Sequence, residues 1–209
     1  MTCVVSIVDN KTGSIHFGCD SLGSNGHSQM VLSDPKIFQN GEMLIGFCGS
    51  FRMGQLLEYS LVVPGRMENQ STGDYLYNSF IDAVKSSFHI GGFGGSNPNR
   101  GGDYFLIGYR EEIYIVQEDY AVLHAVDDFA AIGEGEEPAN AVLYATRNID
   151  MPAIERLSMA LDAASYQIAS VKPPFHFLTY PGTRDPEPKK AKRTRIKKPQ
   201  DKVNHATDI

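Results

Sequence analysis

The chain has 209 residues, of which 42% are hydrophobic and 21% are charged, and its formal net charge at pH 7 is −6. This length and composition suit one domain with a sizeable core. No apolar run approaches the roughly 18 to 20 residues of a membrane span, and the start lacks a charged stretch before an apolar core, so we expect a soluble, cytoplasmic protein and no membrane partner.

Charge divides the chain into two parts. Residues 1–183 carry ten Lys and Arg against twenty-one Asp and Glu, whereas residues 184–209 carry nine against four. The second part lacks aromatic residues and cannot bury enough apolar surface to order itself. We therefore predict a folded domain over 1–183 and a disordered basic tail over 184–209. Weak, salt-sensitive binding of nucleic acid or of an acidic surface, or a nuclear import signal over 188–193, is the functional interpretation of this tail.

The first half of the sequence predicts two β-hairpins and then two helices. The second hairpin turns at Asn40 and Gly41, a dipeptide that favours the positive φ angles of a tight turn. After Ser50, a suitable helix N-cap, the apolar residues change to helical spacing. The predicted strands cover residues 3–9, 14–19, 36–39 and 42–48, and the predicted helices cover about 51–63 and 74–88.

The second half repeats this order with a meander of strands, two helices and a closing strand. The predicted strands cover residues 104–108, 112–117, 121–125, 129–132 and 175–180, and the predicted helices cover about 138–147 and 152–170. Strands that are apolar on both faces must be covered on both faces. The sequence therefore predicts an α+β fold in which two stacked, mainly antiparallel sheets carry a helical layer outside each, a four-layer αββα sandwich.

Thr2 is the residue with the most direct chemical implication. Removal of Met1 would place a hydroxyl and a free amine on one residue at the start of a strand. A threonine hydroxyl is a poor nucleophile, but an α-amine that titrates near about 7.7 to 8.0 can take its proton at neutral pH, directly or through one water. Thr2 would then supply both the nucleophile and the base.

Three further landmarks follow Thr2 along the chain. Asp20 ends an apolar segment, Lys36 comes sixteen residues later, and Gly49 lies in a small-residue turn after a strand. The order resembles that of the proteasome-type N-terminal nucleophile hydrolases, and most closely the bacterial HslV-like threonine peptidases. In that family a Gly-Asp pair, a lysine sixteen residues beyond the aspartate and a small-Gly-Gly/Ser turn follow the N-terminal threonine. The resemblance covers about residues 2–180.

The resemblance implies a role for each of these residues. Lys36 would be a fixed cation that lowers the pKa of the Thr2 amine and hydroxyl, and Asp20 would hold that cation in place. The backbone amide of Gly49 would donate to the oxyanion formed at the attacked carbonyl. Ser21 and Phe47 would lie at the pocket that receives the substrate side chain. Taken singly, Asp20, Lys36 and Gly49 also suit a turn cap, a solvated charge and a strand-to-helix junction.

The second half of the chain departs from the family pattern. Where the family has Gly-Ser-Gly near the threonine amine, this chain has Glu134 between two glycines, and a carboxylate there could hold the amine as a cation and weaken the base. A later family aspartate falls on Tyr166, so Asp162 and Ser165 are the two candidates to take its place. The sequence leaves open whether the site is active.

Other chemistry is poorly represented in the sequence. The three cysteines have apolar neighbours and no metal-site spacing, which favours buried thiols in a reducing compartment, and the six histidines are dispersed. We therefore expect neither a metal nor a cofactor. The glycine-rich segment 89–102 lacks the Gly-Lys-Ser/Thr ending of a phosphate-binding loop and follows a predicted helix, so we interpret it as a surface connection.

Together these features predict a threonine peptidase that degrades unfolded polypeptide. The resemblance implies a homo-oligomeric ring and an ATP-dependent unfoldase as partner. Two alternatives remain: an inactive shell subunit or assembly protein of the same fold, and an N-terminal nucleophile amidohydrolase of small amides.

Overall fold

Both predicted hairpins form, and each lies within one of two antiparallel sheets. The computed structural model describes residues 2–24, 27–93 and 103–184. One sheet has the strand order β10-β1-β2-β11 and the other has the order β5-β6-β7-β8-β9. The strands of these sheets are β1 (Cys3–Val8), β2 (Ile15–Cys19), β5 (Ile37–Asn40), β6 (Met43–Phe47), β7 (Phe105–Tyr109), β8 (Glu112–Val116), β9 (Val122–His124), β10 (Phe129–Gly133) and β11 (His176–Tyr180). The mixed helix and strand content with antiparallel sheets agrees with the prediction.

The helices lie where the sequence predicts them, but two contain wide π-helical turns. Helix α1 (Phe51–Gln55) continues as the π-helical segment Leu56–Ser60, and Ser50 caps it by accepting a hydrogen bond from the Met53 amide. Helix α2 (Thr72–Asp74), the π-helical segment Tyr75–Phe80 and α3 (Ile81–Ile90) form the second helical stretch. Helices α4 (Glu136–Ala145) and α5 (Ala153–Gln167) complete the set.

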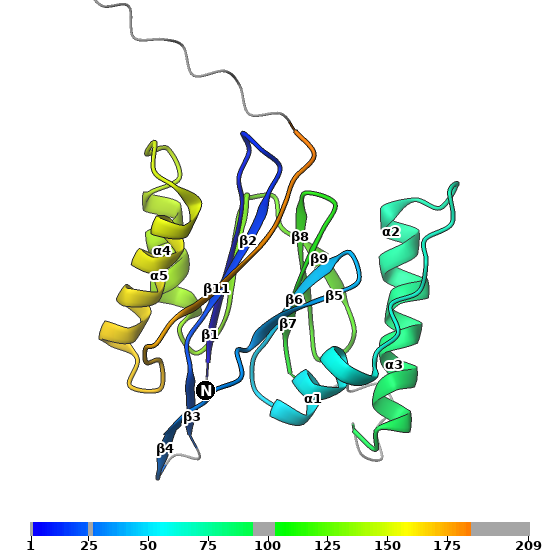
Figure 1. Cartoon of the computed structure of the whole chain (residues 1–209), viewed down its shortest axis with the longest axis horizontal. Helices are drawn as coiled ribbons and strands as arrows, with labels where there is room; N and C mark the ends of the chain where they lie inside the picture. The colour runs from blue at the N-terminus through cyan, green and yellow to red at the C-terminus, as the bar shows by residue number, and fades with distance from the viewer. Residues whose placement is uncertain (1, 25–26, 94–102, 185–209) are drawn as a thin grey trace, which may run out of the picture.

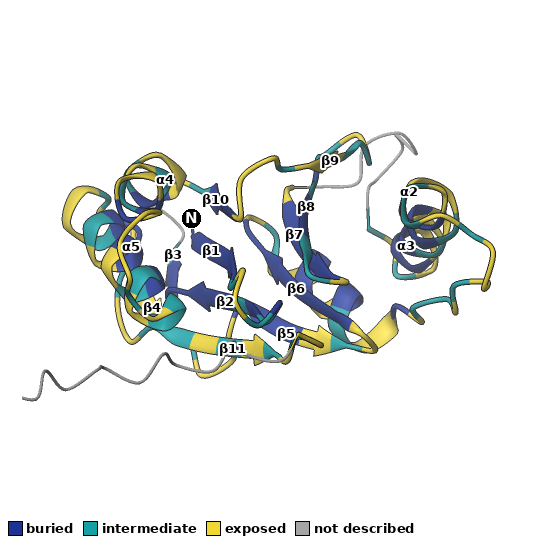
Figure 2. Ribbon diagram, turned by 90° about the horizontal axis from the view of Figure 1, so that it is seen from above, coloured by how far each residue is buried: buried dark blue, intermediate teal, exposed yellow. Residues whose placement is uncertain are grey.

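Apolar side chains fill three separate spaces. Val4, Phe17 and Leu44 lie in a cluster shared by the two sheets. The helices α4 and α5 cover the outer face of the β1 sheet, where Leu157 and Leu161 pack on the strands. Figures 1 and 2 show these two helices on one side of the sheets and α2 and α3 on the other, and Figure 1 shows α1 on the same side as α2 and α3. Strand β1 is therefore buried on both faces, as its mostly apolar sequence predicts, and the hydroxyl of Ser6, its one polar residue, donates to the Ala130 carbonyl at 3.1 Å.

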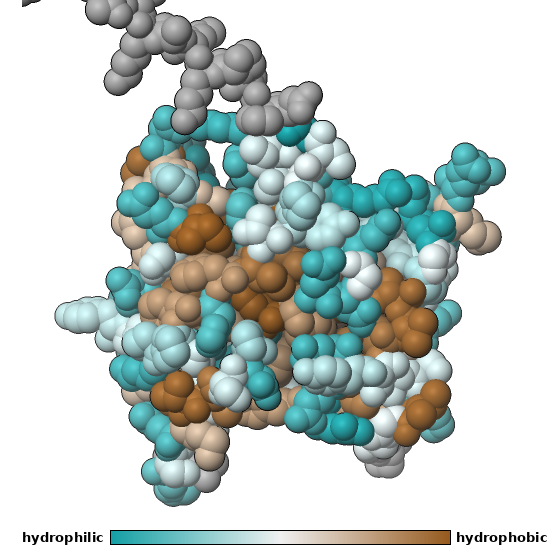
Figure 3. Space-filling view, viewed as in Figure 1, coloured by the Kyte–Doolittle hydropathy of each residue, from teal (hydrophilic) through white to brown (hydrophobic). Residues whose placement is uncertain are grey.

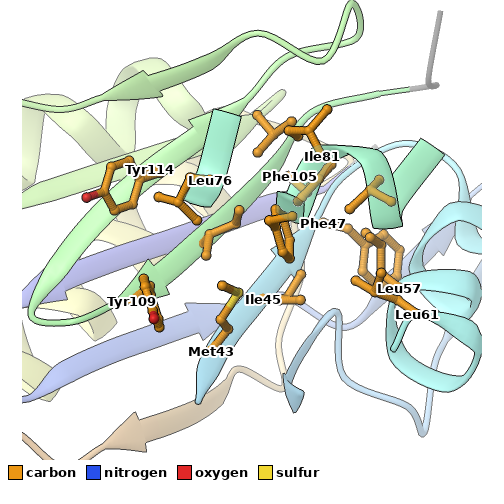
Figure 4. Packing of buried hydrophobic residues seen from close by; sticks show 14 of the residues in the cluster. Met43, Ile45, Phe47, Leu57, Leu61, Leu76, Ile81, Phe105, Tyr109 and Tyr114 are labelled. Carbon is orange, nitrogen blue, oxygen red and sulfur yellow. The ribbon is translucent and has the colours of Figure 1, made fainter. Parts of the chain in front are cut away.

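The third space lies between the β6 sheet and the helices α1 to α3. Met43, Ile45 and Phe47 point from β6 toward these helices, alternating with residues that face the other sheet. Figure 4 shows them beside Leu57 and Leu76 of the helical layer. Burying a side chain of this size stabilises the fold by roughly 1.5 to 3 kcal/mol.

A small third sheet was not predicted. Strands β3 (Leu22–Ser24) and β4 (Gln29–Val31) pair as a hairpin that projects from the body of the molecule (Figure 1). All three residues of β4 are exposed, so the period-2 burial that would mark a strand in the sequence is missing.

The two sheets have two distinct ends. Strand β1 begins at one end, close to the projecting hairpin (Figure 1). We call this the site end, because the predicted site residue Thr2 lies directly before β1. At the far end lie the β1–β2 turn and Arg184, whose amide donates to the Thr12 carbonyl. The remainder of the predicted basic tail, residues 185–209, and most of the glycine-rich segment, residues 94–102, lie outside the described residues. Of the helices in the described part of the chain, none combines the length and apolar composition needed to cross a bilayer.

Candidate active site

A buried ion pair of Lys36 and Asp20 forms the centre of the site end. Asp20 follows β2 directly and Lys36 precedes β5, so each charge sits at the junction between a strand and a loop. The Lys36 Nζ atom donates to Asp20 Oδ1 at 2.8 Å and to the Leu22 carbonyl at 2.8 Å, and the two side chains are 1% and 0% exposed. A buried ion pair is tolerated only when further hydrogen bonds satisfy both partners, and this pair has them.

The same carboxylate holds the start of β1. The Cys3 amide donates to Asp20 Oδ1 at 3.0 Å, and the Asp20 amide donates to the Cys3 carbonyl at 3.2 Å. The Leu22 amide donates to Asp20 Oδ2 at 3.0 Å. Thr2, the residue before Cys3, is 2% exposed. The structure therefore brings together three of the predicted site residues, Thr2, Asp20 and Lys36, at one end of β1.

The end of β10 closes over Thr2 from the other side. Gly133 pairs with Cys3, has φ +94°, and a Cβ atom at this position would lie 2.3 Å from the Thr2 carbonyl oxygen. The Gly135 amide donates to the same oxygen at 3.4 Å. Only glycine meets both the steric and the backbone requirement at position 133.

Glu134 lies between these two glycines and is exposed. Its Oε2 atom accepts a hydrogen bond from the Ser170 hydroxyl, and Ser170 is 7% exposed. The side chain of Glu134 is thus bound to the segment that follows α5. Sequence reasoning missed Ser170, because a single serine after a helix carries no spacing signal.

The two candidates on α5 are placed differently. Leu161 and Ala164 face the sheet, while Asp162 is exposed and Ser165 is partly buried. Tyr166 is 91% exposed. Within the described residues, no hydrogen bond connects Asp162 or Ser165 to Asp20 or Lys36. The role of these two candidates stays a prediction, and α5 itself packs against the segment beside Thr2, because a Cβ atom on Gly135 would lie 3.0 Å from Ala164 Cβ.

Gly49 forms a left-handed turn between β6 and α1. Its φ angle is +79°, which favours glycine at this position. The Cys48 amide donates to the Tyr104 carbonyl at 3.1 Å, and the Ser50 amide donates to Asp103 Oδ2 at 2.9 Å. The predicted oxyanion turn is thus attached on both sides of Gly49 to the residues just before β7.

The two residues predicted for the substrate pocket are both largely buried. The Ser21 hydroxyl donates to the Pro174 carbonyl, and the Ser21 amide donates to the Lys172 carbonyl at 3.1 Å. Phe47 is 6% exposed and packs against Phe51 at the start of α1, with ring centroids 6.2 Å apart. The exposed edge of this aromatic pair is Phe51, which is 40% exposed.

All three cysteines are buried thiols, as predicted. Burial, and then the Asp103 carboxylate, raise the pKa of Cys48 to about 12. Burial likewise raises the pKa of Cys19 to about 12 and raises the pKa of Cys3 well above its usual range. These thiols are protonated at neutral pH and are therefore poor nucleophiles, although Cys3 and Cys48 lie beside Thr2. Within residues 2–24, 27–93 and 103–184, no group of three or more His, Cys, Asp and Glu side chains could hold a metal ion.

No protein-family model matches the sequence, and no curated protein matches it either. Solved structures do match. BPH from Thiobacillus denitrificans in complex with epoxomicin has a TM-score of 0.73 at 16% identity, over 87% of this chain and 100% of that one. HslV from Trypanosoma brucei has a TM-score of 0.63 at 18% identity, over 85% of this chain and 98% of that one.

Anbu from Pseudomonas aeruginosa, solved as a helical assembly, has a TM-score of 0.60 at 18% identity, over 89% of this chain and 87% of that one. The chain therefore has the proteasome-like fold of these proteins. The resemblance that the sequence motifs predict is confirmed at the level of the fold.

Proposed function

We propose that this protein is an N-terminal threonine peptidase that hydrolyses amide bonds of unfolded polypeptide. One observation carries the proposal: the carboxylate of Asp20 binds both the buried Lys36 ammonium and the amide of Cys3, the residue next to Thr2. A fixed cation therefore lies close to the start of β1. In this position it favours loss of a proton from the groups of Thr2.

The reaction begins once the peptide bond between Met1 and Thr2 has been cleaved. The freed amine takes the proton of Thr2 Oγ1, directly or through one water, and the oxygen attacks the substrate carbonyl carbon. The negative charge that forms on the carbonyl oxygen is stabilised by the Gly49 amide, a type of contact worth roughly 2.7 to 4 kcal/mol. The C–N bond breaks as the leaving amine takes the proton, and water then hydrolyses the acyl ester of Thr2.

The proposal includes the layer order of the fold and the roles of two pocket residues. Apolar clusters between the sheets and outside each sheet support a four-layer αββα sandwich of the N-terminal nucleophile type over residues 1–183, followed by the basic tail. Ser21 follows Asp20 directly, and the Phe47 amide donates to the Lys36 carbonyl at 3.0 Å, which supports a role for both residues in substrate binding.

A homo-oligomer that encloses the site is the proposed working form, with an ATP-dependent unfoldase as supplier of substrate in the cytoplasm. Enclosure keeps an unselective nucleophile away from folded proteins. Strand β11 is an edge strand of its sheet and alternates between partly buried and exposed residues, with Phe177 37% exposed. In Figure 3, apolar side chains gather in the middle of the face that β11 crosses, and unpaired edges of this kind suit contact with another chain.

An inactive subunit is the second candidate, and Glu134 is the observation that favours it. The exposed carboxylate follows Gly133, which contacts Thr2, so the freed amine would have an anion close by. An anion stabilises the protonated amine and removes the base. The Ser170 hydroxyl donates to this carboxylate and so competes with the amine for it, which favours the active form. An amidohydrolase of small amides is the third candidate and would spare unfolded protein.

The test combines the intact mass of the purified protein with labelling by epoxomicin. We expect the mass to lack Met1 and epoxomicin to form an adduct on Thr2, found by peptide mapping. The Thr2→Ala variant should take no label, whereas the matched Thr12→Ala variant, which changes a threonine at the far end, should label like the parent. A protein that retains Met1 and takes no label would be the inactive subunit.

A further inference from the structure

Asp103 lies in direct contact with the Gly49 turn. A Cβ atom built on Gly49 would lie 2.1 Å from Asp103 Oδ2 and 2.6 Å from Asp103 Cβ. The aspartate therefore occupies the space that any side chain at position 49 would need. The closeness of the two residues is independent evidence that this turn is built around Gly49.

The Asp103 carboxylate continues the hydrogen bonding between β6 and β7 beyond the ends of these strands. The ladder between β6 and β7 ends with Phe47 opposite Phe105, and the Cys48 amide donates to the Tyr104 carbonyl at 3.1 Å. The next link is the bond of 2.9 Å from the Ser50 amide to Asp103 Oδ2. The Asp103 side chain thus takes the place of a backbone acceptor at the point where the chain turns into α1.

These bonds leave the Gly49 amide as the one in this turn that can donate to a substrate. The amides of Cys48 and Ser50 are both committed, the first to Tyr104 and the second to Asp103. The peptide between Gly49 and Ser50 cannot rotate without breaking the bond to the carboxylate. The Gly49 amide is held between two anchored neighbours, which suits a donor that must already be aimed before charge develops.

We propose that Asp103 is a positioning residue for acyl transfer, holding the turn so that the Gly49 amide donates to the oxyanion. This inference rests on the proposed function. The useful property of Asp103 is its acceptor oxygen, because a negative charge near a developing oxyanion opposes the reaction. An asparagine, which keeps an acceptor oxygen without the charge, should therefore replace the aspartate, whereas an alanine should not.

The experiment compares peptide hydrolysis and the rate of epoxomicin labelling among four proteins. We expect Asp103→Ala to lower kcat at least about tenfold with KM changed less than about threefold, since loss of an aimed oxyanion donor lowers kcat by roughly 100- to 1,000-fold and a loosened donor by less. Asp103→Asn should stay within about threefold of the parent. Asp119→Ala is the matched control, because Asp119 Oδ1 accepts the Ala121 amide at 2.9 Å in a turn before β9.

Hydrogen exchange tests the same turn in a protein that has no catalytic activity. In the Thr2→Ala background, Asp103→Ala should remove hydrogen-exchange protection from the Ser50 amide, whereas Asp119→Ala should leave that amide unchanged. If Asp103→Ala does not fold, Asp103→Leu, which has the same number and branching of side-chain heavy atoms but lacks the acceptor, takes its place.

The outcomes separate this inference from the proposed function. A parent protein that neither hydrolyses peptide nor takes label overturns the function, while the exchange experiment still reports on the turn. An active parent with an equally active Asp103→Ala variant overturns the positioning role. Equal losses in the alanine and asparagine variants would also overturn it, since the acceptor oxygen would then not be the property that matters.

Discussion

Ion pairs at the two ends of the sheets have similar lengths but opposite surroundings. At the site end, Lys36 and Asp20 meet at 2.8 Å with side chains 1% and 0% exposed. At the far end, Arg184 and Glu111 meet at 2.7 Å with side chains 49% and 20% exposed. Water screens the second pair and competes for its hydrogen bonds, while the first pair depends on the protein alone. Burial, and not distance, therefore decides how strongly the fold depends on a pair.

The far end also contains a cleft that is open to solvent. A cleft of about 390 Å³ lies there, lined by Gly13, Ile15, Glu42, Tyr109, Arg110, Glu111, Tyr180, Pro181, Gly182 and Thr183. Hydrogen bonds from Thr183, and then the Arg184 guanidinium, lower the pKa of Glu111. Because Glu111 is bound mostly by the residues that follow β11, its contacts attach the end of the folded domain.

The first prediction separates the two pairs by stability. Lys36→Met leaves the buried Asp20 without its cation, so we expect the free energy of unfolding to fall by roughly 3 to 5 kcal/mol. Arg184→Met should lower it by no more than about 1 kcal/mol. Urea unfolding of both variants measures the contrast, and salt should reduce only the far-end effect.

Equal losses in these two variants would contradict the comparison. A double variant, Asp20→Asn with Lys36→Met, adds a control because it removes both charges. It should be more stable than Lys36→Met alone, since the neutral amide is less costly to bury than an unpaired carboxylate.

The second prediction compares glycines at two places with positive φ. Gly133→Ala adds a Cβ atom 2.3 Å from the Thr2 carbonyl oxygen, whereas Gly92, at φ +67°, has nothing within 4 Å of such an atom. Gly133→Ala should lower the free energy of unfolding by roughly 3 kcal/mol, from strain and overpacking together. Gly92→Ala should lower it by about 1 kcal/mol, from backbone strain alone. Thermal unfolding of both variants tests the difference, and equal shifts would show that Thr2 can move away.

The third prediction concerns the thiols, all three of which lie at the site end. Burial raises the pKa of Cys19 and Cys48 to about 12, above the value of about 8.5 in an unfolded chain. A raised folded pKa means that the stabilisation is complete below the unfolded pKa and is lost as pH rises toward 12.

We therefore expect the free energy of unfolding to fall by roughly 1 kcal/mol between pH 7 and pH 8.5 for the three thiols together. The measurement is urea unfolding at several pH values, with the triple variant to alanine as control. A thiol reagent at pH 8 should modify the native protein slowly and the unfolded protein at once. Rapid reaction of native Cys48 would contradict the burial of the site end.

Much of the fold follows from local pattern. The hairpins, the meander and the four long helical stretches lie within a few residues of their predicted bounds, because apolar periodicity reports which face of each element is buried. The exposed β3 and β4 hairpin has no such pattern, and the wide π-helical turns at 56–60 and 75–80 leave helical spacing almost unchanged. Sequence reasoning could find neither feature.

The site was predictable to a different degree for each residue. Asp20, Lys36 and Gly49 have a characteristic order and interval, and in the fold the Asp20 carboxylate binds both Lys36 and the start of β1. Their catalytic roles stay a prediction until Thr2 is labelled. Asp103 and Ser170 have no interval to reveal them, since each acts through a contact between segments that are far apart in the chain.

By itself, the amino-acid sequence determined the order of strands and helices, the burial of the hairpins and the presence of a threonine, an aspartate and a lysine at suggestive intervals. Only the tertiary structure decided that one carboxylate would bind both the lysine and the first strand, and that a second carboxylate would hold the Gly49 turn. The physical reason is that the spacing of apolar residues reports only which face of a helix or strand is buried. Hydrogen bonds between distant segments depend on the packing of the two sheets, and no local pattern specifies that packing.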